Sequence, residues 1–191
     1  MQCLDFKEAR QQYVKGSKRW KVTVLKEIFG YDSFRKGQEE IVDQILNGRD
    51  VLAIMPTGAG KSLCYQVPAL LMSGITIVVS PLISLMIDQV KALNEAGVHA
   101  AYINSALTER QITKALELAA AGRYKMIYVA PERLLTPRFL DFACHTELSM
   151  VTIDEAHCIS QWGQDFRPSY VKITEFIRQL PRRPVVSAFT A

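Results

Sequence analysis

The feature that most constrains the fold is a glycine-rich segment, residues 55–62, with the sequence Met-Pro-Thr-Gly-Ala-Gly-Lys-Ser. A short apolar run, Val51 to Met55, comes before it, and a helical pattern begins at about Lys61. Glycines in such a turn allow backbone N–H groups to surround phosphate oxygens, and the N-terminus of the following helix adds a favourable dipole. The strict P-loop pattern has glycine at its first position, where this chain has Met55. The segment nevertheless predicts a nucleotide-phosphate site within a strand–loop–helix unit.

Each residue type in this segment has a chemical role in holding a nucleotide. The Lys61 ammonium is expected to reach the β- and γ-phosphates of ATP, and the Ser62 hydroxyl to bind Mg²⁺. A glycine-rich turn that merely contains a lysine is the alternative, which the strand before it and the helix after it disfavour. The residues of this loop expected to bind ATP are Thr57, Gly58, Ala59, Gly60, Lys61 and Ser62.

Apolar runs and helical patterns alternate along the rest of the chain. The runs are continuous rather than alternating with polar residues, which is typical of strands buried on both faces of a parallel sheet. Thr108 and Gln111 have the spacing of a capping box and mark a helix that ends at about Ala121. We expect strands at residues 51–55, 75–80, 100–103, 126–130, 150–154 and 185–189, and helices at about 22–29, 41–46, from 61 onward, 85–96 and 108–121. The sequence therefore predicts a doubly wound α/β domain with a mostly parallel sheet flanked by helices.

Composition limits the class of protein. The 191 residues suffice for one domain with a sizeable core, and the net charge of +4 permits nucleic-acid binding without requiring it. The four cysteines show no paired spacing, so neither a disulfide framework nor a zinc site is expected. No apolar run is long enough to span a membrane, and the N-terminus lacks the apolar segment of a signal peptide. We expect a cytoplasmic protein without a membrane partner, with a loosely attached extension at residues 1–19 and a folded domain at residues 20–191.

A second chemical motif follows the apolar run at residues 150–153. Asp154 stands where a buried strand is expected to end, a position from which a carboxylate can hold Mg²⁺ opposite the phosphate loop. Glu155 can polarise the attacking water as a general base, and His157 can form a hydrogen bond toward the γ-phosphate. A solvated turn would explain this segment alone, but its pairing with Lys61, about 90 residues earlier, favours a catalytic ATPase site.

From about residue 20 onward, the sequence resembles the RecQ family of DNA helicases. Residues 154–157, Asp-Glu-Ala-His, look like motif II of that family, and residues 187–191 look like motif III, which couples the nucleotide state to DNA movement. The resemblance implies a RecA-like P-loop NTPase fold, ATP and Mg²⁺ as cofactors, and single-stranded and forked DNA as partners. It also implies that the full-length protein has a second RecA-like domain, which supplies an arginine finger.

Residues 29–38 resemble motif 0 of the same family. By that resemblance, Gln38 recognises the adenine edge, Tyr31 packs against the base and Arg35 supports the nucleotide. A glutamine amide suits adenine because it offers one donor and one acceptor. Without the resemblance, Gln38 would be interpreted as a solvated helix residue.

Two further loops resemble the DNA-backbone contacts of the family. Residues 79–89 look like motif Ia and residues 130–133 like motif Ib, and each follows an expected strand. Contacts to phosphates need no sequence recognition, so hydroxyls and backbone amides suit this role. The residues expected to contact DNA in these loops are Ser80, Pro81, Ser84, Gln89 and Arg133. Taken alone, the Ser-Pro pair would be an ordinary turn at a strand end.

The segment at residues 157–170 resembles the aromatic-rich loop that distinguishes RecQ helicases from other superfamily 2 motors. Trp162 and Phe166 offer flat faces on which unpaired bases can stack, and Arg167 adds a cation. The alternative is that Trp162, Phe166 and Tyr170, spaced four apart, form one buried helical stripe. The segment also departs from the family at Gln164, where close relatives often carry histidine.

The resemblance implies a motor half that couples ATP hydrolysis to 3′-to-5′ movement along single-stranded DNA and to duplex unwinding in the full-length protein. This half alone is expected to bind ATP weakly and to hydrolyse it slowly. The protein would be nucleoid-associated in a bacterium and nuclear in a eukaryote. Three alternatives stay open: a small P-loop kinase, a non-enzymatic nucleic-acid-binding module, and an RNA helicase of the same superfamily.

Overall fold

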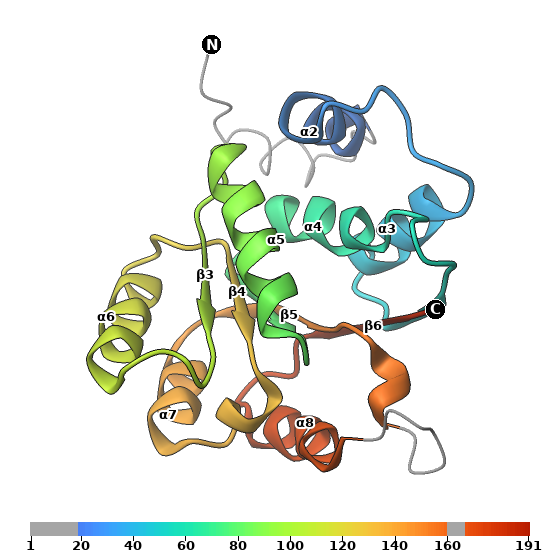
Figure 1. Cartoon of the computed structure of the whole chain (residues 1–191). Helices are drawn as coiled ribbons and strands as arrows, with labels where there is room; N and C mark the ends of the chain where they lie inside the picture. The colour runs from blue at the N-terminus through green and yellow to red at the C-terminus, as the bar shows by residue number, and fades with distance from the viewer. Residues whose placement is uncertain (1–18, 160–166) are drawn as a thin grey trace.

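The computed structural model describes residues 19–159 and 167–191, which form one sheet with helices on both faces (Figure 1). The expected extension therefore lies outside the described residues, except for Arg19. All five strand pairings are parallel, and the order across the sheet is β1-β6-β5-β2-β4-β3. The strands are β1 (Val51–Ile54), β2 (Ile75–Val79), β3 (Ala100–Ile103), β4 (Met126–Val129), β5 (Leu148–Ile153) and β6 (Val185–Thr190). The predicted doubly wound parallel sheet is confirmed, with strand ends within two residues of those expected.

The helices divide between the two faces of the sheet according to the direction in which the chain moves. While the chain moves from β1 to β2 and on to β3, the connecting helices α4 and α5 cover one face; on the way back, the connecting helices cover the other. Right-handed crossovers between parallel strands require this division. The first face carries α2 (Arg19–Phe29), α3 (Gln38–Leu46), α4 (Lys61–Leu71) and α5 (Ile83–Glu95), and the second carries α6 (Glu109–Ala120), α7 (Pro137–His145) and α8 (Pro168–Gln179).

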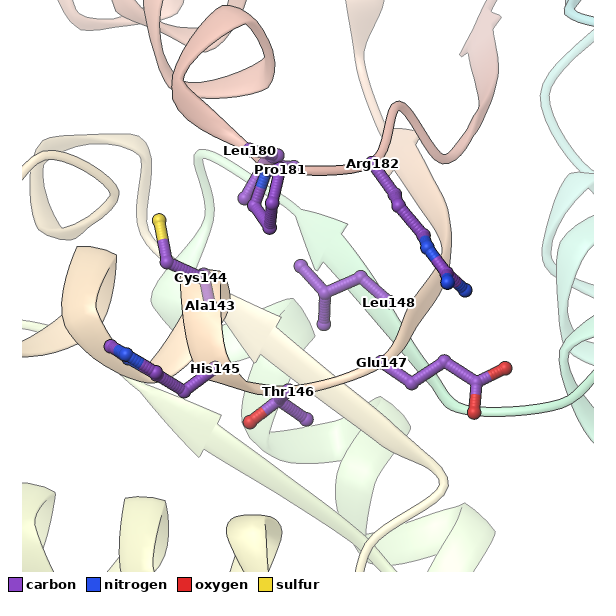
Figure 2. Close-up of a pocket in the computed structure, with 9 residues that line it drawn as sticks. All are labelled: Ala143, Cys144, His145, Thr146, Glu147, Leu148, Leu180, Pro181 and Arg182. Carbon is purple, nitrogen blue, oxygen red and sulfur yellow. The ribbon is translucent and has the colours of Figure 1, made fainter.

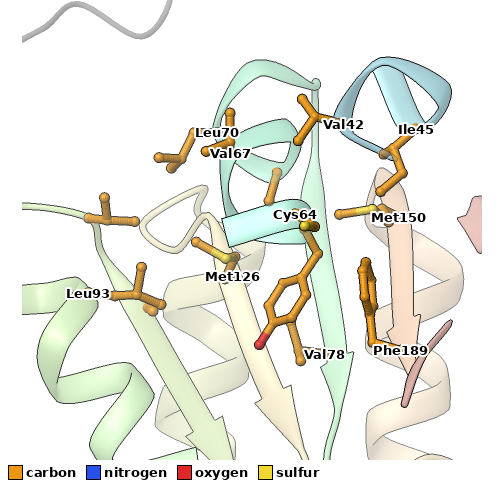
Figure 3. Close-up of a cluster of buried hydrophobic side chains, with 14 of the residues drawn as sticks. Val42, Ile45, Cys64, Val67, Leu70, Val78, Leu93, Met126, Met150 and Phe189 are labelled. Atoms are coloured by element: carbon orange, nitrogen blue, oxygen red, sulfur yellow. The ribbon is translucent and has the colours of Figure 1, made fainter. Parts of the chain in front are cut away.

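Each face of the sheet closes over its own hydrophobic cluster. Figure 3 shows part of the first cluster, in which Val42 and Ile45 of α3 and Val67 and Leu70 of α4 lie over Val78, Met150 and Phe189 of the sheet. The second cluster joins α6, α7 and α8 to the opposite face, with Phe139, Phe142 and Phe176 at its centre. The central strands β2 and β4 are buried along their whole length, as their continuous apolar runs predict.

Strand β1 differs from this prediction. Its apolar run also predicts burial on both faces, but Leu52 and Ile54 are 68% and 75% exposed. The prediction is wrong for these two side chains because β1 lies at the edge of the sheet, and none of the described helices covers its second face. Ala53 and Met55, on the opposite side, are buried in the first cluster.

Sequence signals mark the N-termini of three helices. Thr108 and Gln111 form the expected capping box at the start of α6. Helices α7 and α8, which the sequence analysis did not predict, each begin with proline at the first helical position, where its missing N–H has no intrahelical partner to lose. Tyr170 lies on α8 and is buried, but this helix begins only at Pro168. The other two members of the proposed aromatic stripe, Trp162 and Phe166, lie outside the described residues.

Candidate nucleotide and nucleic-acid site

The sequence motifs meet at the carboxyl edge of the sheet. After β2 the chain enters α5 on one face, whereas after the neighbouring β5 it enters the short 3-10 helix η2 (Ala156–Ile159) and then α8 on the other face. In doubly wound sheets, ligands usually bind where two neighbouring connections leave toward opposite faces. Ser80 and Asp154 stand at the ends of these two strands.

The glycine-rich loop enters this edge from β1. Gly58 and Gly60 have φ values of 79° and 78°, a region that glycine adopts without steric strain. Gly60 is the N-cap of α4 and supplies no side-chain hydrogen bond, so the first N–H groups of the helix are not capped by a side chain. Uncapped N–H groups at a helix N-terminus bind anions well. Met55, the departure from the strict motif, has a structural reason: its side chain is buried in the first cluster beside Cys64.

Arg35 and Gln38 hold this loop from the side. The Gln38 side chain is buried; its Nε2 donates to the carbonyl oxygens of Ala59 (2.9 Å) and Gly60 (3.2 Å), and its Oε1 accepts from the Arg35 N–H (2.8 Å). The Arg35 guanidinium donates to the Gly58 carbonyl oxygen at 2.7 Å. The predicted adenine-side residues and the phosphate loop therefore lie together, with the Gln38 amide bonded to the loop. Tyr31 is nearby in sequence and 48% exposed.

Asp154 is buried at the end of β5, opposite the loop. Burial raises the pKa of its carboxyl group above the ordinary value, and the neighbouring Glu155 charge raises it further. The Lys61 ammonium and the Ser80 hydroxyl lower this pKa, which places both groups near the carboxylate. The Ser80 oxygen has no hydrogen-bond partner of normal geometry among the described residues. The structure therefore brings Lys61 and Asp154 to the same edge of the sheet, as the sequence analysis expects, and it places Ser80 beside them.

The residues that follow Asp154 are held in an unusual backbone conformation. Glu155 has a φ of 49°, a left-handed value that is uncommon outside glycine, and its N–H donates to Asp154 Oδ1 at 3.1 Å. His157 Nδ1 lies 3.3 Å from Glu155 Oε2 and 2.9 Å from Thr190 Oγ1. The Tyr170 hydroxyl donates to the Asp154 carbonyl oxygen at 2.9 Å. These contacts join the end of β5 to the end of β6 and to α8.

The structure also locates most of the residues expected to contact DNA. Ser84 is exposed, and Gln89 on α5 is half-buried. Arg133, in the 3-10 helix η1 (Pro131–Arg133), pairs with Glu109 at 3.5 Å. The Arg167 guanidinium donates to the Pro81 carbonyl oxygen at 3.2 Å, so the segment after β5 contacts the segment after β2. The expected stacking residues Trp162 and Phe166 are not among the described residues.

Sequence reasoning missed a set of buried polar side chains behind the site. Gln66 on α4 donates to Gln89 Oε1 at 2.9 Å and to the Tyr128 hydroxyl at 3.1 Å, and the Tyr65 and Tyr128 hydroxyls are 3.5 Å apart. One signal was available, because Gln66 interrupts the apolar run of α4 with an amide. A polar residue on the buried stripe of a helix needs partners in the core.

Two hollows lie at the opposite, amino edge of the sheet. The first, of about 270 Å³, is bordered by the end of α7, the start of β5 and the turn after α8 (Figure 2). The second, of about 540 Å³, lies on the other side of that α7–β5 turn and shares His145, Thr146 and Glu147 with the first. No residue of the sequence motifs lines either hollow, so neither belongs to the candidate site.

The donor set at the carboxyl edge fits Mg²⁺ bound together with a nucleotide. The described residues contain no cluster of three or more histidine, cysteine, aspartate or glutamate side chains that could hold a metal ion by themselves. Magnesium usually takes one or two protein oxygens and completes its shell with phosphates and water. Ser62 and Asp154 can supply those protein oxygens beside the phosphate loop. Among the described helices, none has the length and apolar character to cross a membrane.

Comparisons with known proteins identify the family of this chain. The family model of DEAD/DEAH box helicases matches residues 35–191. The ATP-dependent DNA helicase RecQ of Bacillus subtilis (strain 168) is 51% identical over 170 residues, which are 88% of this chain and 29% of that protein. RecQ of Haemophilus influenzae is 47% identical over 166 residues, which are 87% of this chain and 27% of that protein. A putative ATP-dependent RNA helicase of Acanthamoeba polyphaga mimivirus is 43% identical over 170 residues, which are 86% of this chain and 30% of that protein.

Solved structures show the same fold at low sequence identity. The helicase MrfA bound to DNA and AMPPNP superposes with a TM-score of 0.69 at 18% identity, over 92% of this chain and 26% of that one. A hypothetical ATP-dependent RNA helicase from Sulfolobus tokodaii superposes with a TM-score of 0.66 at 18% identity, over 96% of this chain and 50% of that one. The fold is therefore that of a RecA-like helicase domain.

The chain spans less than a third of the length of each of the three curated relatives named above, so their resemblance concerns one part of a longer protein. That part contains the phosphate loop and the carboxylates at one edge of the sheet. Because the matching family model covers most of the sequence and RecQ helicases match nearly nine-tenths of it, the chain belongs to the DEAD/DEAH box helicases and is a RecQ-type motor domain among them.

Proposed function

We propose that this domain is the ATP-binding half of a motor that couples ATP hydrolysis to 3′-to-5′ movement along single-stranded DNA and to unwinding of forked DNA. One observation supports this proposal most. Lys61 begins the helix that follows β1 and Asp154 follows β5, so these two residues, 93 positions apart in the sequence, lie at the same edge of the parallel sheet, and the lysine charge lowers the pKa of the aspartate. P-loop ATPases hold the phosphates with such a lysine and Mg²⁺ with such a carboxylate.

Different parts of the site bind the phosphates and the metal ion of Mg·ATP. The N–H groups of Gly58, Gly60, Lys61 and Ser62 and the Lys61 ammonium bind the phosphates, while the Ala59 N–H donates to the Pro56 carbonyl oxygen. The Ser62 and Asp154 oxygens would hold Mg²⁺, which would supply positive charge beside the phosphates. Gln38 leaves the loop carbonyls when it recognises adenine, Tyr31 packs against the base, and Arg35 supports the nucleotide. Thr57 and Ala59 are the remaining residues of the loop that binds ATP.

The residues after β5 position the attacking water. Glu155 accepts its proton as a general base, and the contact to His157 fixes the orientation of the Glu155 carboxylate. His157 also contacts the Thr190 hydroxyl, so the segment after β5 and the end of β6 move together. That contact gives motif III a direct connection to the water-activating carboxylate.

A second RecA-like domain completes the site. Phosphoryl transfer needs positive charge around the γ-phosphate, and an arginine finger from the second domain supplies it at a gain of about 10³ to 10⁵ in rate. We therefore expect the isolated chain to bind Mg·ATP weakly and to hydrolyse it slowly. In the cell, the motor acts in the cytoplasm of a bacterium, on the nucleoid, or in the nucleus of a eukaryote.

The nucleic acid at the carboxyl edge is DNA. Pro81, Ser84, Gln89, Arg133 and Arg167 form its backbone path, and Trp162 and Phe166 stack on its bases. Ser80, which the sequence analysis also expects to contact DNA, is 1% exposed beside Asp154 and is not part of this path. An RNA motor is the second candidate, because a putative RNA helicase is 43% identical to this chain. Stimulation of hydrolysis by single-stranded DNA and by single-stranded RNA of the same length separates the two.

The test is steady-state ATPase activity of the chain with and without single-stranded DNA. We expect slow hydrolysis that DNA accelerates more than RNA does, and we expect Lys61→Ala to weaken Mg·ATP binding about 10- to 100-fold, the effect of losing a charge-assisted hydrogen bond. The matched control is Lys91→Ala, an exposed lysine on α5 that pairs with Glu95.

Three outcomes would contradict the proposal. Unchanged Mg·ATP affinity in Lys61→Ala would indicate a non-enzymatic nucleic-acid-binding module. ADP production that rises with a nucleoside or sugar instead of DNA would indicate a small-molecule kinase. Robust duplex unwinding by the isolated chain would contradict the need for a second domain.

A further inference from the structure

A network of hydrogen-bonded polar side chains, most of them buried, connects α5 with the phosphate loop. It begins at Gln89, which is half-buried on α5, and its Oε1 accepts a hydrogen bond from Gln66 Nε2 at 2.9 Å. Gln66 is 5% exposed and donates a second bond to the Tyr128 hydroxyl of β4 at 3.1 Å. This side-chain amide therefore connects a helix near the predicted DNA path to the centre of the sheet.

The same network continues from Tyr128 to Tyr65, near the proposed magnesium ligands. The Tyr128 and Tyr65 hydroxyls are 3.5 Å apart, and both side chains are 1% exposed. Burial raises the pKa of Tyr65 well above its ordinary value, and the Tyr128 and Asp154 charges add to this. Tyr65 is three positions after Ser62 on α4, so the two side chains are neighbours on the helix surface. Tyr65 thus lies beside the two groups proposed to hold Mg²⁺.

The buried hydroxyls of this network all have partners. Gln66 donates to the Tyr128 oxygen, and either tyrosine hydroxyl can donate to the other. A buried network that loses one bond leaves a polar group unpaired in a medium where this is costly. If Gln89 moves, Gln66 and the hydroxyls bonded to it are therefore expected to move with it, because each would otherwise lose a hydrogen bond.

We propose that Gln66, with Tyr65 and Tyr128, positions the Ser62 hydroxyl according to the place of Gln89, so that single-stranded DNA on α5 and Mg·ATP at the phosphate loop alter each other's affinity. This inference rests on the proposed function, since it takes Gln89 as a DNA contact and Ser62 as a magnesium ligand. Gln66 is a positioning residue, because it touches neither ligand. The route is separate from the segment that follows β5.

The test measures the coupling between the two ligands in the whole chain. The dissociation constant of Mg·AMPPNP is measured with and without saturating oligothymidylate, and that of oligothymidylate with and without Mg·AMPPNP; the two ratios must agree. We expect a ratio of about fivefold or more in the unmodified chain, the usual lower range of allosteric coupling. Gln66→Met keeps the length of the side chain but removes both hydrogen bonds, and we expect its ratio to fall to within about twofold of one.

Two further variants separate positioning from a general loss of packing. Tyr128→Phe removes one oxygen from the middle of the network and should also remove the coupling, so it decides the question if Gln66→Met does not fold. Thr76→Val is the matched control: Thr76 is fully buried on β2, and its hydroxyl has no partner among the described residues. Its coupling ratio should equal that of the unmodified chain.

The outcomes distinguish this inference from the proposed function. Undiminished coupling in Gln66→Met and Tyr128→Phe would overturn the inference, whatever their melting temperatures. An unmodified chain that binds both ligands without coupling would also overturn it, and the proposed function would stand. A Lys61→Ala variant with unchanged Mg·AMPPNP affinity would instead remove the proposed function, and the inference with it.

Discussion

The polar groups at the two edges of the sheet differ in how they are bonded. At the amino edge, charged groups are paired: the Asp50 carboxylate accepts hydrogen bonds from the Arg183 guanidinium and from the Val186 N–H, and the Lys125 ammonium donates to the carbonyl oxygens of Met72 and Gly74. These contacts tie neighbouring strands together where the chain enters the sheet. The result is an edge whose polar side chains stabilise the fold.

At the carboxyl edge, polar groups are left available or strained. The first N–H groups of α4 have no side-chain cap, Glu155 has a φ of 49°, and burial raises the pKa of Asp154. Strained and unsatisfied groups concentrate at functional sites because a ligand completes them. The contrast indicates that substitutions at the amino edge change stability, whereas substitutions at the carboxyl edge change binding.

The largest expected effect on stability is that of Gly74→Ala at the amino edge. Gly74 has a φ of 71°, and a Cβ there would lie 2.3 Å from the backbone oxygen of Glu147. Both the left-handed backbone and the backbone clash destabilise the variant, so we expect the free energy of unfolding to fall by more than about 2 kcal/mol. Urea denaturation measures this loss, and Mg·ATP affinity of the folded fraction should be retained.

Gly48→Ala is the matched control for Gly74→Ala. Gly48 has nearly the same φ, 75°, but a Cβ there would meet no atom within 4 Å. Only the backbone strain remains, and we expect a loss of about 1–2 kcal/mol. Equal losses in the two variants would show that the clash with Glu147 has no effect and would weaken the contrast between the edges.

Asp154→Asn, at the carboxyl edge, should affect binding more than stability. A folded-state pKa above the unfolded value means that the ionised carboxylate lowers stability at neutral pH, and that this disadvantage disappears as the pH falls through the folded pKa toward 3.8. The variant should therefore be as stable as the unmodified chain at pH 7, or more stable. Its ATP affinity should depend less on Mg²⁺ than that of the unmodified chain, which titrations with and without EDTA measure; a large loss of stability would contradict this assignment.

Asp50→Asn should have the smallest effect and the opposite dependence on pH. The hydrogen bond from Arg183 lowers the pKa of Asp50, so its contribution to stability is complete above the unfolded value of 3.8 and is lost as the pH falls through the folded pKa. The pair is partly exposed, and we expect a loss of no more than about 1 kcal/mol at pH 7, smaller in high salt. A difference between variant and unmodified chain that grows toward low pH would contradict the pairing.

The sheet could be predicted from the sequence because its central strands are continuous apolar runs. The phosphate loop was also predictable, since the glycines and Lys61 lie within one segment between a strand and a helix. The exposure of Leu52 and Ile54 was not, because an apolar run does not show whether a strand lies at the centre or the edge of its sheet. Helix α7 was not predicted because it has only nine residues, so Phe139 and Phe142 alone do not form a clear helical pattern.

Contacts between distant segments lay beyond sequence reasoning. Gln38 was singled out for adenine, but its hydrogen bonds to the phosphate loop cross 21 and 22 positions. Gln66 could be noticed as an amide on a buried helical face, yet its partner Tyr128 is 62 positions away. Which polar groups meet in a core is set by how the strands are ordered, and the order of the strands is not encoded in any one segment.

The central claim is that Mg·ATP binds between the phosphate loop and Asp154 at the carboxyl edge. A crystal structure of the chain with Mg·AMPPNP tests it most directly. We expect the phosphates against the N-terminus of α4 and the Lys61 ammonium, with Mg²⁺ between Ser62 and the Asp154 carboxylate. A nucleotide bound elsewhere, such as in the hollows at the amino edge, or a metal ion far from Asp154, would contradict the account.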